Sequence, residues 1–424
     1  MRTMHVLISG AGIAGPALAW WLARNGIAQV TIIEKAQSIL PHGHNVDIGG
    51  SARTVIKKMG LRDKVLELNT TEKGTQFIDP KGRPYAAFPV QQGSAASLTS
   101  EWEIMRGDLA KLLSEEAKKC PGVEFLFGTT ISSVLSNDST SVKVLLSNGE
   151  TRSYDLLVAA DGQWSKVRKQ CFPPEAVTVV DKDMYVGYWT IPRLPSDNEW
   201  WNIYHGLGSK MISTRPDPHG TIRAMMSQMP LSPAQKRAWQ EASKADRQSQ
   251  QDLLRKEFGA AGWQADRLLE EMDAAPDFYF QAVQQIKMAK WSEGRVVCLG
   301  DTAYAPTPLT GMGTSLALLG AYVLAGELGK LPPNGESQHP AVALDAYEKV
   351  FRPFVEEVQV IPSWIPGIAH PETAWKRWVF GVVMGVISWL ASWRWLVSRF
   401  GKDDDAEDFV LPVYLEPEVG AGEK

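Results

Sequence analysis

A glycine-rich segment near the start of the chain has the residue spacing of a phosphate-binding turn. Gly10, Gly12 and Gly15 stand in the pattern Gly-x-Gly-x-x-Gly. The first glycine permits a tight turn, the second lets the backbone approach a diphosphate, and the third lets a helix pack closely on a strand. The N–H groups of Ile13 and Ala14, where that helix begins, are candidate phosphate donors. The pattern predicts a dinucleotide site, with an ordinary glycine-rich turn as the alternative.

The segments around this turn have the order that such a site needs. Residues 6–9 and 30–34 are apolar runs typical of buried strands, and residues 16–25 between them favour a helix. Glu34 ends the second run, where its carboxylate can accept hydrogen bonds from both ribose hydroxyls of an adenosine. Lys35 follows it as a weaker candidate. This unit alone does not distinguish NAD from FAD.

Two later motifs, each preceded by an apolar run, make that distinction. The first is Asp161-Gly162-Gln163-Trp164-Ser165-Lys166-Val167-Arg168, and the second runs from Gly300-Asp301-Thr302-Ala303-Tyr304 through Pro308 to Gly311-Met312-Gly313. They resemble the D-G-x-x-S-x-V-R and G-D-A-A-H-x-x-x-P-x-x-G-x-G motifs of single-component (class A) FAD-dependent aromatic monooxygenases, which have the para-hydroxybenzoate hydroxylase fold. With the glycine turn, the three motifs stand in that family's order. The tetracycline-inactivating and polyketide-tailoring members are the most similar group.

The resemblance implies that the third motif contacts the flavin end of FAD. Asp301 would meet a ribityl hydroxyl, and Pro308 would hold the chain against the flavin ring. Gly311, Met312 and Gly313 precede an expected helix, whose N-terminus would face an anionic edge of the flavin. A helix cap or a solvated turn is the alternative for the aspartate.

Three further residues receive roles through the same resemblance. Arg106, just before a Gly-Asp-Leu sequence, would contact FAD, and a surface arginine paired with Asp108 or Glu103 is the alternative. Asp161 would brace the loop over the cofactor and help to receive NAD(P)H. His44 falls where some relatives carry a flavin-loop arginine, and a solvent-exposed histidine is the alternative.

The family's reaction implies the cofactors and the chemistry. NADPH or NADH reduces the flavin, O2 then forms a flavin C4a-hydroperoxide, and its distal oxygen hydroxylates an electron-rich carbon. One departure is that Tyr304 stands where the family usually has a histidine, so no role for a histidine is expected there. Arg168 would either contact the nicotinamide phosphates or form a surface salt bridge. Other flavin oxidoreductases (oxidase, epoxidase or halogenase) are the second hypothesis, and a non-catalytic flavin-binding redox or membrane-associated module is the third.

The expected fold is α/β, with a Rossmann-like FAD-binding domain (a doubly wound, mostly parallel sheet), an inserted antiparallel-sheet substrate domain and a C-terminal helical segment. Expected helices include residues 55–66, 107–119, 233–257 and 314–328, and expected strands of the inserted sheet are 184–191, 202–205, 210–214 and 221–227. The predicted FAD-binding domain comprises residues 1–75, 101–175 and 281–365, the substrate domain 76–100 and 176–280, and the C-terminal helix and tail 366–424.

The inserted sheet supplies the substrate candidates, which are mostly aromatic. They are Tyr188, Trp189, Trp201, Tyr204 and Arg215. Flat aromatic walls suit a small aromatic substrate, and core packing of each ring is the alternative. The sequence names no catalytic residue and predicts no metal site.

Flavin halogenases carry the motif W-x-W-x-I-P. Trp189, Ile191 and Pro192 match it, but Gly187 stands where its first tryptophan belongs, which places halogenation below hydroxylation.

The bulk composition excludes several classes of protein. The 424 residues carry a net charge of -4 without a Lys/Arg run, so no nucleic-acid partner is expected. The three cysteines lie far apart, which favours a reducing compartment, and no signal peptide precedes the glycine turn. We therefore expect a cytoplasmic protein.

An apolar stretch at 378–393 leaves three interpretations open. A helix packed on the protein body is favoured, a helix lying in a membrane surface is less favoured, and a transmembrane anchor is least favoured because the stretch is short. Residues 409–414 are expected to form an extended segment that returns to the body, and residues 415–424 to be disordered.

Overall fold

The computed structural model describes residues 3–39, 43–90, 100–332, 339–362, 365–391 and 408–414. Its first layer is a six-stranded sheet in the order β17-β18-β11-β1-β2-β7. The strands are β17 (Ser292–Glu293), β18 (Val296–Cys298), β11 (Leu156–Ala159), β1 (Met4–Ser9), β2 (Ala28–Glu34) and β7 (Val123–Phe127). All of these neighbours pair in parallel except β17 with β18, so the parallel sheet expected from the apolar runs is present.

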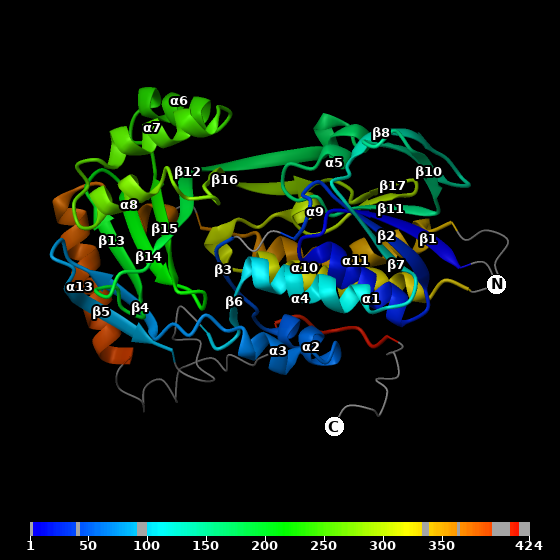
Figure 1. The fold of residues 1–424 in the computed structure, drawn as a ribbon, viewed down its shortest axis with the longest axis horizontal. Coiled ribbons are helices and arrows are strands. Elements are labelled where there is room, and N and C mark those ends of the chain that lie inside the picture. Colours follow the sequence, from blue (N-terminus) through cyan, green and yellow to red (C-terminus); the bar gives the residue numbers. More distant parts are fainter. Residues whose placement is uncertain are drawn as a thin grey trace.

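Helices stack against this sheet (Figure 1). They are α1 (Ala14–Arg24), α4 (Arg106–Lys118), α10 (Gly313–Gly329) and α11 (Ala341–Val358). Residues Thr314 to Leu328 of α10 are all buried, so this helix is apolar on every side and lies in the middle of the core. A three-stranded antiparallel sheet packs on the same core and contains β8 (Ile131–Asn137), β9 (Val142–Leu146) and β10 (Thr151–Tyr154).

The second layer is a seven-stranded sheet in the order β16-β12-β15-β14-β13-β4-β5. Its strands are β16 (Tyr279–Met288), β12 (Val177–Pro192), β15 (Thr221–Gln228), β14 (Lys210–Pro216), β13 (Trp201–Gly206), β4 (Gly74–Ile78) and β5 (Pro84–Pro89). The pairing is antiparallel except between β13 and β4. We call the face covered by α6 (Pro233–Ala242), α7 (Arg247–Phe258) and α8 (Ala265–Glu271) the outer face, and the opposite face the inner face.

Two predicted helices are each interrupted in the structure. The stretch 55–66 forms α2 (Ser51–Lys58) and α3 (Arg62–Glu67), because Gly60 between them has a φ of 71°. The stretch 233–257 forms α6 and α7, because Asp246 begins a new helix by accepting a hydrogen bond from the Ser249 backbone N–H at 2.8 Å. The first break rests on a glycine and the second on a polar cap, and in both places the periodicity alone suggested continuity.

A short antiparallel ribbon lies between the two large sheets. It pairs β3 (Asn45–Asp47) with β6 (Glu103–Met105). The ribbon leads directly into α4, and the backbone N–H of Arg106 donates to the carbonyl of His44 at 3.1 Å. The ribbon therefore fixes His44 and Arg106 next to each other at the boundary of the two layers.

The C-terminal helix α13 (Ala374–Ala391) packs on the protein through only one of its faces. Phe380 and Met384 join the apolar cluster under β5, and the Ser388 hydroxyl donates to the Ala87 carbonyl at 2.8 Å. The opposite face is exposed and carries Trp375, Val379, Val383, Val386 and Ile387. The favoured packed-helix interpretation thus accounts for half of the helix, and residues 392 and 393 of the predicted stretch lie outside the described residues. Among the helices that the structure describes, none is long and apolar enough to cross a membrane.

Residues 408–414 return to the body as expected. Phe409 packs on Phe351 and Phe354, and the Tyr414 hydroxyl donates to Glu327 at 2.7 Å. Residues 415–424, for which disorder was expected, lie outside the described part of the chain.

The packing of α10 leaves no room for a side chain at Gly320. A Cβ atom there would overlap with the hydroxyl of Tyr304, and it would lie 3.2 Å from Leu299 and Phe351. We expect Gly320→Ala to lower the free energy of unfolding by about 1–3 kcal/mol, because overpacking forces neighbours out of place. Tyr304→Phe removes the overlapping atom, so the free energy of unfolding of the double variant should fall by less than the sum of the losses in the two single variants.

Urea denaturation of the four proteins measures this coupling. Strict additivity would show that the tyrosine hydroxyl does not limit the helix position.

Candidate flavin site

The glycine turn connects β1 to α1 and brings backbone into direct contact with backbone. Gly10 has a φ of 112°, and a Cβ atom on it would overlap with the carbonyl oxygen of Ala160 at the end of β11. A Cβ on Gly15 would overlap with the carbonyl oxygen of Gly10. Gly12 differs, because nothing lies within 4 Å of its Cβ position. Two glycines thus close the turn, and the third leaves open space before it, as a diphosphate requires.

The polar groups beside this open space are set to receive an adenosine diphosphate. No side chain caps the N-terminus of α1, and its first turn has no acidic residue. Its free N–H groups therefore remain available to phosphate. Glu34 accepts hydrogen bonds from the backbone N–H groups of Ala11 and Ala36, both at 3.0 Å, which holds its carboxylate next to the turn. Lys35 is exposed and forms no ion pair with any described residue.

The second and third motifs are joined to each other. The Thr302 hydroxyl accepts from the Gly162 backbone N–H at 2.9 Å and donates to the Gly162 carbonyl at 3.2 Å. Arg168 is buried and donates to the carbonyls of Thr302 and Gln163 at 2.6 and 2.7 Å. The surface salt bridge is therefore wrong, because the residue is 3% exposed, while the contact with the nicotinamide phosphates stays a prediction. In the structure, Arg168 positions the two motifs.

Side-chain hydrogen bonds to the backbone hold the turn of the second motif, residues 161–168, in place. Asp161 accepts from the Lys166 backbone N–H at 3.0 Å, and the Ser165 hydroxyl accepts from the Arg168 backbone N–H at 2.9 Å. The other Asp161 oxygen is buried without a partner among the described residues, and burial raises the pKa of the carboxyl. Asp161 thus braces the turn of the second motif, and its place over FAD stays a prediction.

Asp301 follows β18 as the first residue of the short helix α9 (Asp301–Tyr304). Its side chain is exposed, yet the surrounding protein is dense enough that burial raises the pKa of its carboxyl. A Cβ on Gly313 would lie 3.8 Å from its Oδ1 atom, so the carboxylate stands next to the start of α10. That start also has no side-chain cap and no acid in its first turn. The arrangement offers a carboxylate and free N–H groups to one ligand.

The remaining segment of the third motif forms a tight, strained turn. Thr307 has a φ of 85°, Pro308 begins a short 3-10 helix (Pro308–Thr310), and Gly311 has a φ of 65°. Met312 is the cap residue of α10 and packs partly on the main core. Such strain is typical of backbone that is held for a ligand.

The segment that leads into the β3–β6 ribbon contacts the seven-stranded sheet through two stacked rings. The ring centroids of His44 and Tyr188 are 5.3 Å apart at 21°. Burial, with the charges of Arg106 and Arg215, lowers the pKa of His44 to about 3, so this ring is neutral near pH 7. The exposed-histidine alternative is therefore wrong. Arg106 is exposed at the same place and is not paired with Asp108 or Glu103, which bind other partners in the described structure.

Tyr304 explains why a histidine is not needed in the third motif. Its ring is buried, and its hydroxyl bonds to that of Tyr347 at 2.9 Å on the side of α10 and α11. The residue therefore serves packing, and the cavity is left to Asp301.

Arg215 corrects one substrate prediction. Its guanidinium donates two hydrogen bonds to Glu72, both at 2.8 Å, forms an ion pair with Glu103, and lies 4.0 Å over the Trp201 ring. The cation is neutralised and would not bind an acidic substrate. Burial raises the pKa of Glu72 to about 8 although Arg215 acts in the opposite direction, and burial with Glu103 raises the pKa of Asp47 to about 7.

The aromatic candidates divide between the two faces of the sheet. Tyr188 lies on the inner face with Met225 and Val283. Trp189 is buried on the outer face, where its indole N–H donates to the Leu268 carbonyl at 3.0 Å, and the Tyr204 hydroxyl donates to the Ala261 carbonyl at 3.0 Å. The substrate prediction for Trp189 and Tyr204 is therefore wrong, because helices α6 to α8 cover that face.

Sequence reasoning missed Tyr279, which pairs with Tyr188 in the β12–β16 register. The Tyr279 hydroxyl donates to Gln281 at 3.1 Å, and Arg106 lies near enough to act on the pKa of the Tyr279 phenol. The strand β16, which begins at Tyr279, was not predicted, so neither the residue nor its partner strand was identified.

Comparisons with known proteins agree with this geometry. Residues 3–360 match the FAD binding domain family. The chain is 36% identical over 412 residues to monooxygenase CTB7 of Cercospora beticola, covering 94% of this chain and 95% of that protein. It is 33% identical over 436 residues to FAD-dependent monooxygenase asL6 of Sarocladium schorii, covering 99% and 100%. The solved structure of tetracycline destructase Tet(55) superposes with a TM-score of 0.76 at 29% identity, covering 97% of this chain and 99% of that one.

The chain therefore belongs to the FAD binding domain family and has the fold of the class A flavoprotein monooxygenases. It is an FAD-dependent monooxygenase.

Asp301→Ala should weaken FAD binding by about tenfold or more, since a hydrogen bond to a charged group contributes about 1.5–3 kcal/mol. Flavin fluorescence titration of the apoprotein measures the Kd. Asp345→Ala provides a control, because the Asp345 side chain is 65% exposed and distant in sequence from the three motifs. If Asp301→Ala and the control bind FAD with equal affinity, Asp301 does not contribute to FAD binding.

Glu72→Gln should make stability depend less on pH. A carboxyl whose pKa is raised to about 8 on folding stabilises the folded state at low pH, and this contribution is lost as the pH rises from about 4.5 to about 8. When the pH rises from about 6 to about 9, the free energy of unfolding of the wild type should therefore fall by on the order of 1 kcal/mol more than that of the variant. Urea denaturation at both pH values measures it. Glu115→Gln, whose side chain is 55% exposed, is the control, and parallel pH profiles for wild type and Glu72→Gln would contradict the assignment.

Proposed function

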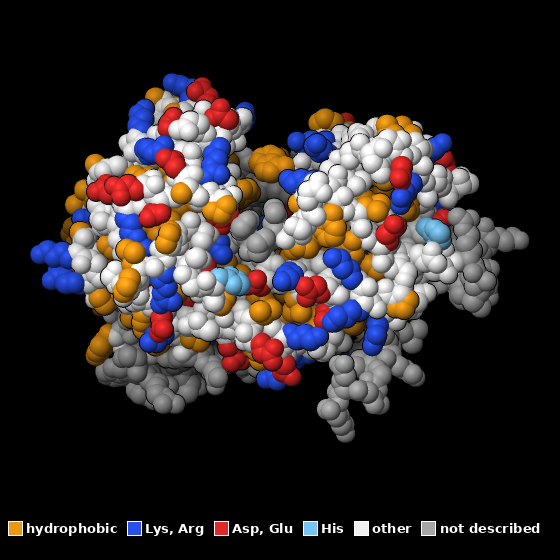
Figure 2. Space-filling view, in the orientation of Figure 1, with side chains coloured by type: hydrophobic (Ala, Val, Ile, Leu, Met, Phe, Trp, Pro, Cys, Tyr) orange, Lys and Arg blue, Asp and Glu red, His pale blue; other side chains and the backbone are white. Residues whose placement is uncertain are grey.

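We propose that this monooxygenase uses NADPH or NADH and O2 to hydroxylate an aromatic or polyketide-like small molecule in the cleft between the two large sheets. The observation that carries the proposal is the stack of His44 on Tyr188. It places the inner face of the seven-stranded sheet directly beside the residues that would hold the flavin. Figure 2 shows the surface hollowed between the lobe of α6 and α7 and the lobe of α5 (Lys166–Cys171) and β8.

The chain's own residues divide the work of holding FAD. The start of α1 and Glu34 would bind the adenosine diphosphate end, and Asp301 with the start of α10 would bind the flavin end. When bound, FAD supplies the redox and oxygen chemistry, and the protein supplies orientation and a dry site. The positioning roles belong to Thr302 and Arg168, which fix the two motifs relative to each other.

The inner face favours an apolar, flat substrate. Its partly buried residues Tyr188, Met225, Met229 and Leu309 are apolar apart from the Tyr188 hydroxyl, and they pack on a buried apolar cluster of Met184, Val186 and Val283. Methionine side chains adapt to irregular shapes, so such a wall suits fused rings of differing outline. Both arginines of this face are ion-paired: Arg215 with Glu72 and Glu103, and Arg223 with Asp217 and Asp277.

The relatives support the same substrate class. Tet(55) is named for its action on tetracycline, a multi-ring polyketide-type molecule, and it shares the fold over nearly the whole chain. CTB7 and asL6 are named as monooxygenases without a stated substrate.

Halogenation is disfavoured by the packing of Gly187. A Cβ there would lie 2.8 Å from Leu254, so the tryptophan that the halogenase motif requires has no space. Oxidase and epoxidase activities remain alternatives that the reaction products distinguish.

The test is turnover of FAD-loaded protein with NADPH or NADH, O2 carrying an oxygen label and a panel of phenols and polyhydroxylated fused-ring aromatics. The expected result is substrate-stimulated NAD(P)H oxidation, with one labelled oxygen atom gained per product molecule. An oxidised product without label, accompanied by one H2O2 per turnover, would replace hydroxylation by oxidase chemistry.

Two neighbouring residues separate substrate orientation from fold stability. Tyr188→Ala should divert a larger share of NAD(P)H to H2O2, because the substrate loses its wall and the cleft admits water. Trp189→Phe changes the adjacent residue on the outer face and should leave this ratio unchanged. The coupling ratio, product formed per NAD(P)H consumed, is the measurement, and an equal ratio in both variants would argue against substrate binding at Tyr188.

A further inference from the structure

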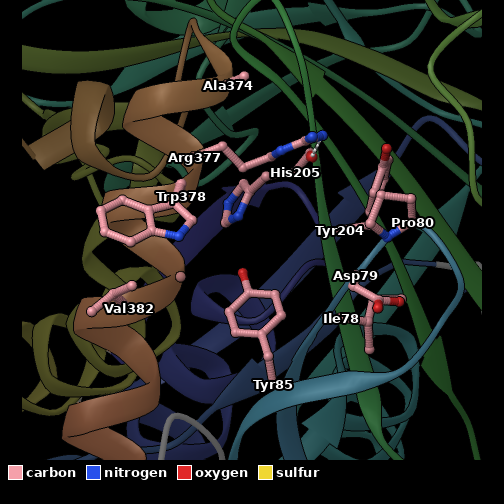
Figure 3. Close-up of a pocket in the computed structure, with 11 residues that line it drawn as sticks. Ile78, Asp79, Pro80, Tyr85, Tyr204, His205, Ala374, Arg377, Trp378 and Val382 are labelled. Carbon is pink, nitrogen blue, oxygen red and sulfur yellow. Dashed lines mark hydrogen bonds between the residues drawn. The ribbon is translucent and has the colours of Figure 1, made fainter.

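A second cavity lies at the edge of the seven-stranded sheet, between α13 and the strands β4 and β13 (Figure 3). Its volume is about 470 Å³, within the range of small-molecule sites. None of the residues assigned to the flavin site lines it, and Tyr188 does not line it either. It is therefore a cavity separate from the proposed reaction cleft.

The walls of this cavity are apolar and partly aromatic. Trp378 and Val382 of α13 form one side, and Tyr85 of β5 lies across from them with Ile78 and Pro80 nearby (Figure 3). Gly381 lies on the helix between them and adds no side chain; a Cβ on it would already be in van der Waals contact with the Tyr85 ring at 3.6 Å. Opposed rings around an open slot suit a flat apolar molecule.

One cation reaches into this slot without a compensating acid. Arg377 donates to the His205 carbonyl at 3.3 Å, and no carboxylate among the described residues pairs with it. The acid that lines the cavity, Asp79, is already bound by Arg83 at 2.6 Å and by two backbone N–H groups. The cavity therefore carries a net positive charge.

A buried imidazole marks the inner end of the cavity. His205 is 2% exposed, and its Nδ1 atom has no hydrogen-bond partner among the described residues. Its ring faces the space between Trp378 and Tyr85 (Figure 3), and the rings of Phe77 and Phe380 contact it at centroid distances of 5.9 and 4.6 Å. Because Nδ1 is buried, the imidazole supplies a flat wall to the cavity.

We propose that this cavity is a second ligand site, which binds a planar molecule of two or three rings that carries one acidic group. The rings would lie between Trp378 and Tyr85, and the acidic group would pair with Arg377. The site needs no turnover at the flavin, so it stands or falls independently of the proposed reaction.

Anilinonaphthalene sulfonate is a suitable probe, because it has flat rings, a sulfonate and a fluorescence that rises in apolar surroundings. Titrated into FAD-loaded protein, it should show one saturable site. Arg377→Gln should weaken that binding about tenfold, the loss expected for one charged contact. Uncharged N-phenylnaphthylamine should bind wild type and Arg377→Gln equally.

Three further variants locate the dye. Gly381→Trp fills the slot and should abolish binding of both probes, with an unchanged Tm as the check on folding. Val383→Ser changes the exposed face of the same helix, outside the cavity, and should have no effect. Tyr188→Ala changes the reaction cleft and should also leave dye binding unchanged.

Retention of the site in Gly381→Trp, or its loss in Val383→Ser or Tyr188→Ala, would overturn the proposal, as would equal sulfonate affinity in Arg377→Gln and wild type. The first results would place the dye on the helix surface or in the cleft, and the last would remove the role of the cation.

Discussion

The structure depends on one contact that leaves no space for a side chain. The turn after β1 lies so close to the end of β11 that a Cβ on Gly10 would overlap with the carbonyl of Ala160. The next residue after that carbonyl is Asp161, so the contact brings the second motif onto the first. Gly300 completes the set, since a Cβ on it would lie 3.2 Å from that of Ala14. The three motifs therefore meet at the carboxyl ends of adjacent parallel strands, where ligands bind in such sheets.

The departures from the family pattern are explained by this meeting point. Thr302 replaces an alanine, and its hydroxyl makes the reciprocal hydrogen bonds to Gly162 that an alanine could not make. Tyr304 replaces a histidine and turns into the core, where its hydroxyl bonds to Tyr347. Both side chains bond to the surrounding protein. The aspartate of the motif, Asp301, is retained.

Local patterns in the sequence predicted the parallel sheet and its three motifs. They did not predict which residues surround the candidate substrate-binding side chains. The parallel strands, the glycine turn and the family membership could be read because each depends on residues close in sequence. Strand alternation put Tyr188 and Trp189 on opposite faces, yet it could not say which face the helices cover. Arg215 was misread because its partners, Glu72 and Glu103, are supplied by segments more than a hundred positions away. The pairing of Tyr279 with Tyr188 was missed for the same reason.

The cleft joins two walls of opposite character. One wall carries Asp301, Arg106 and two uncapped helix starts, which suits a cofactor with phosphates and a polar ring edge. The other wall is the inner face, whose arginines are already neutralised by acids. A neutral His44 stacked on Tyr188 joins the walls without adding charge. Because an unpaired charge facing an apolar ring would be costly to desolvate, this separation supports the proposal that a charged cofactor and an apolar substrate share one site.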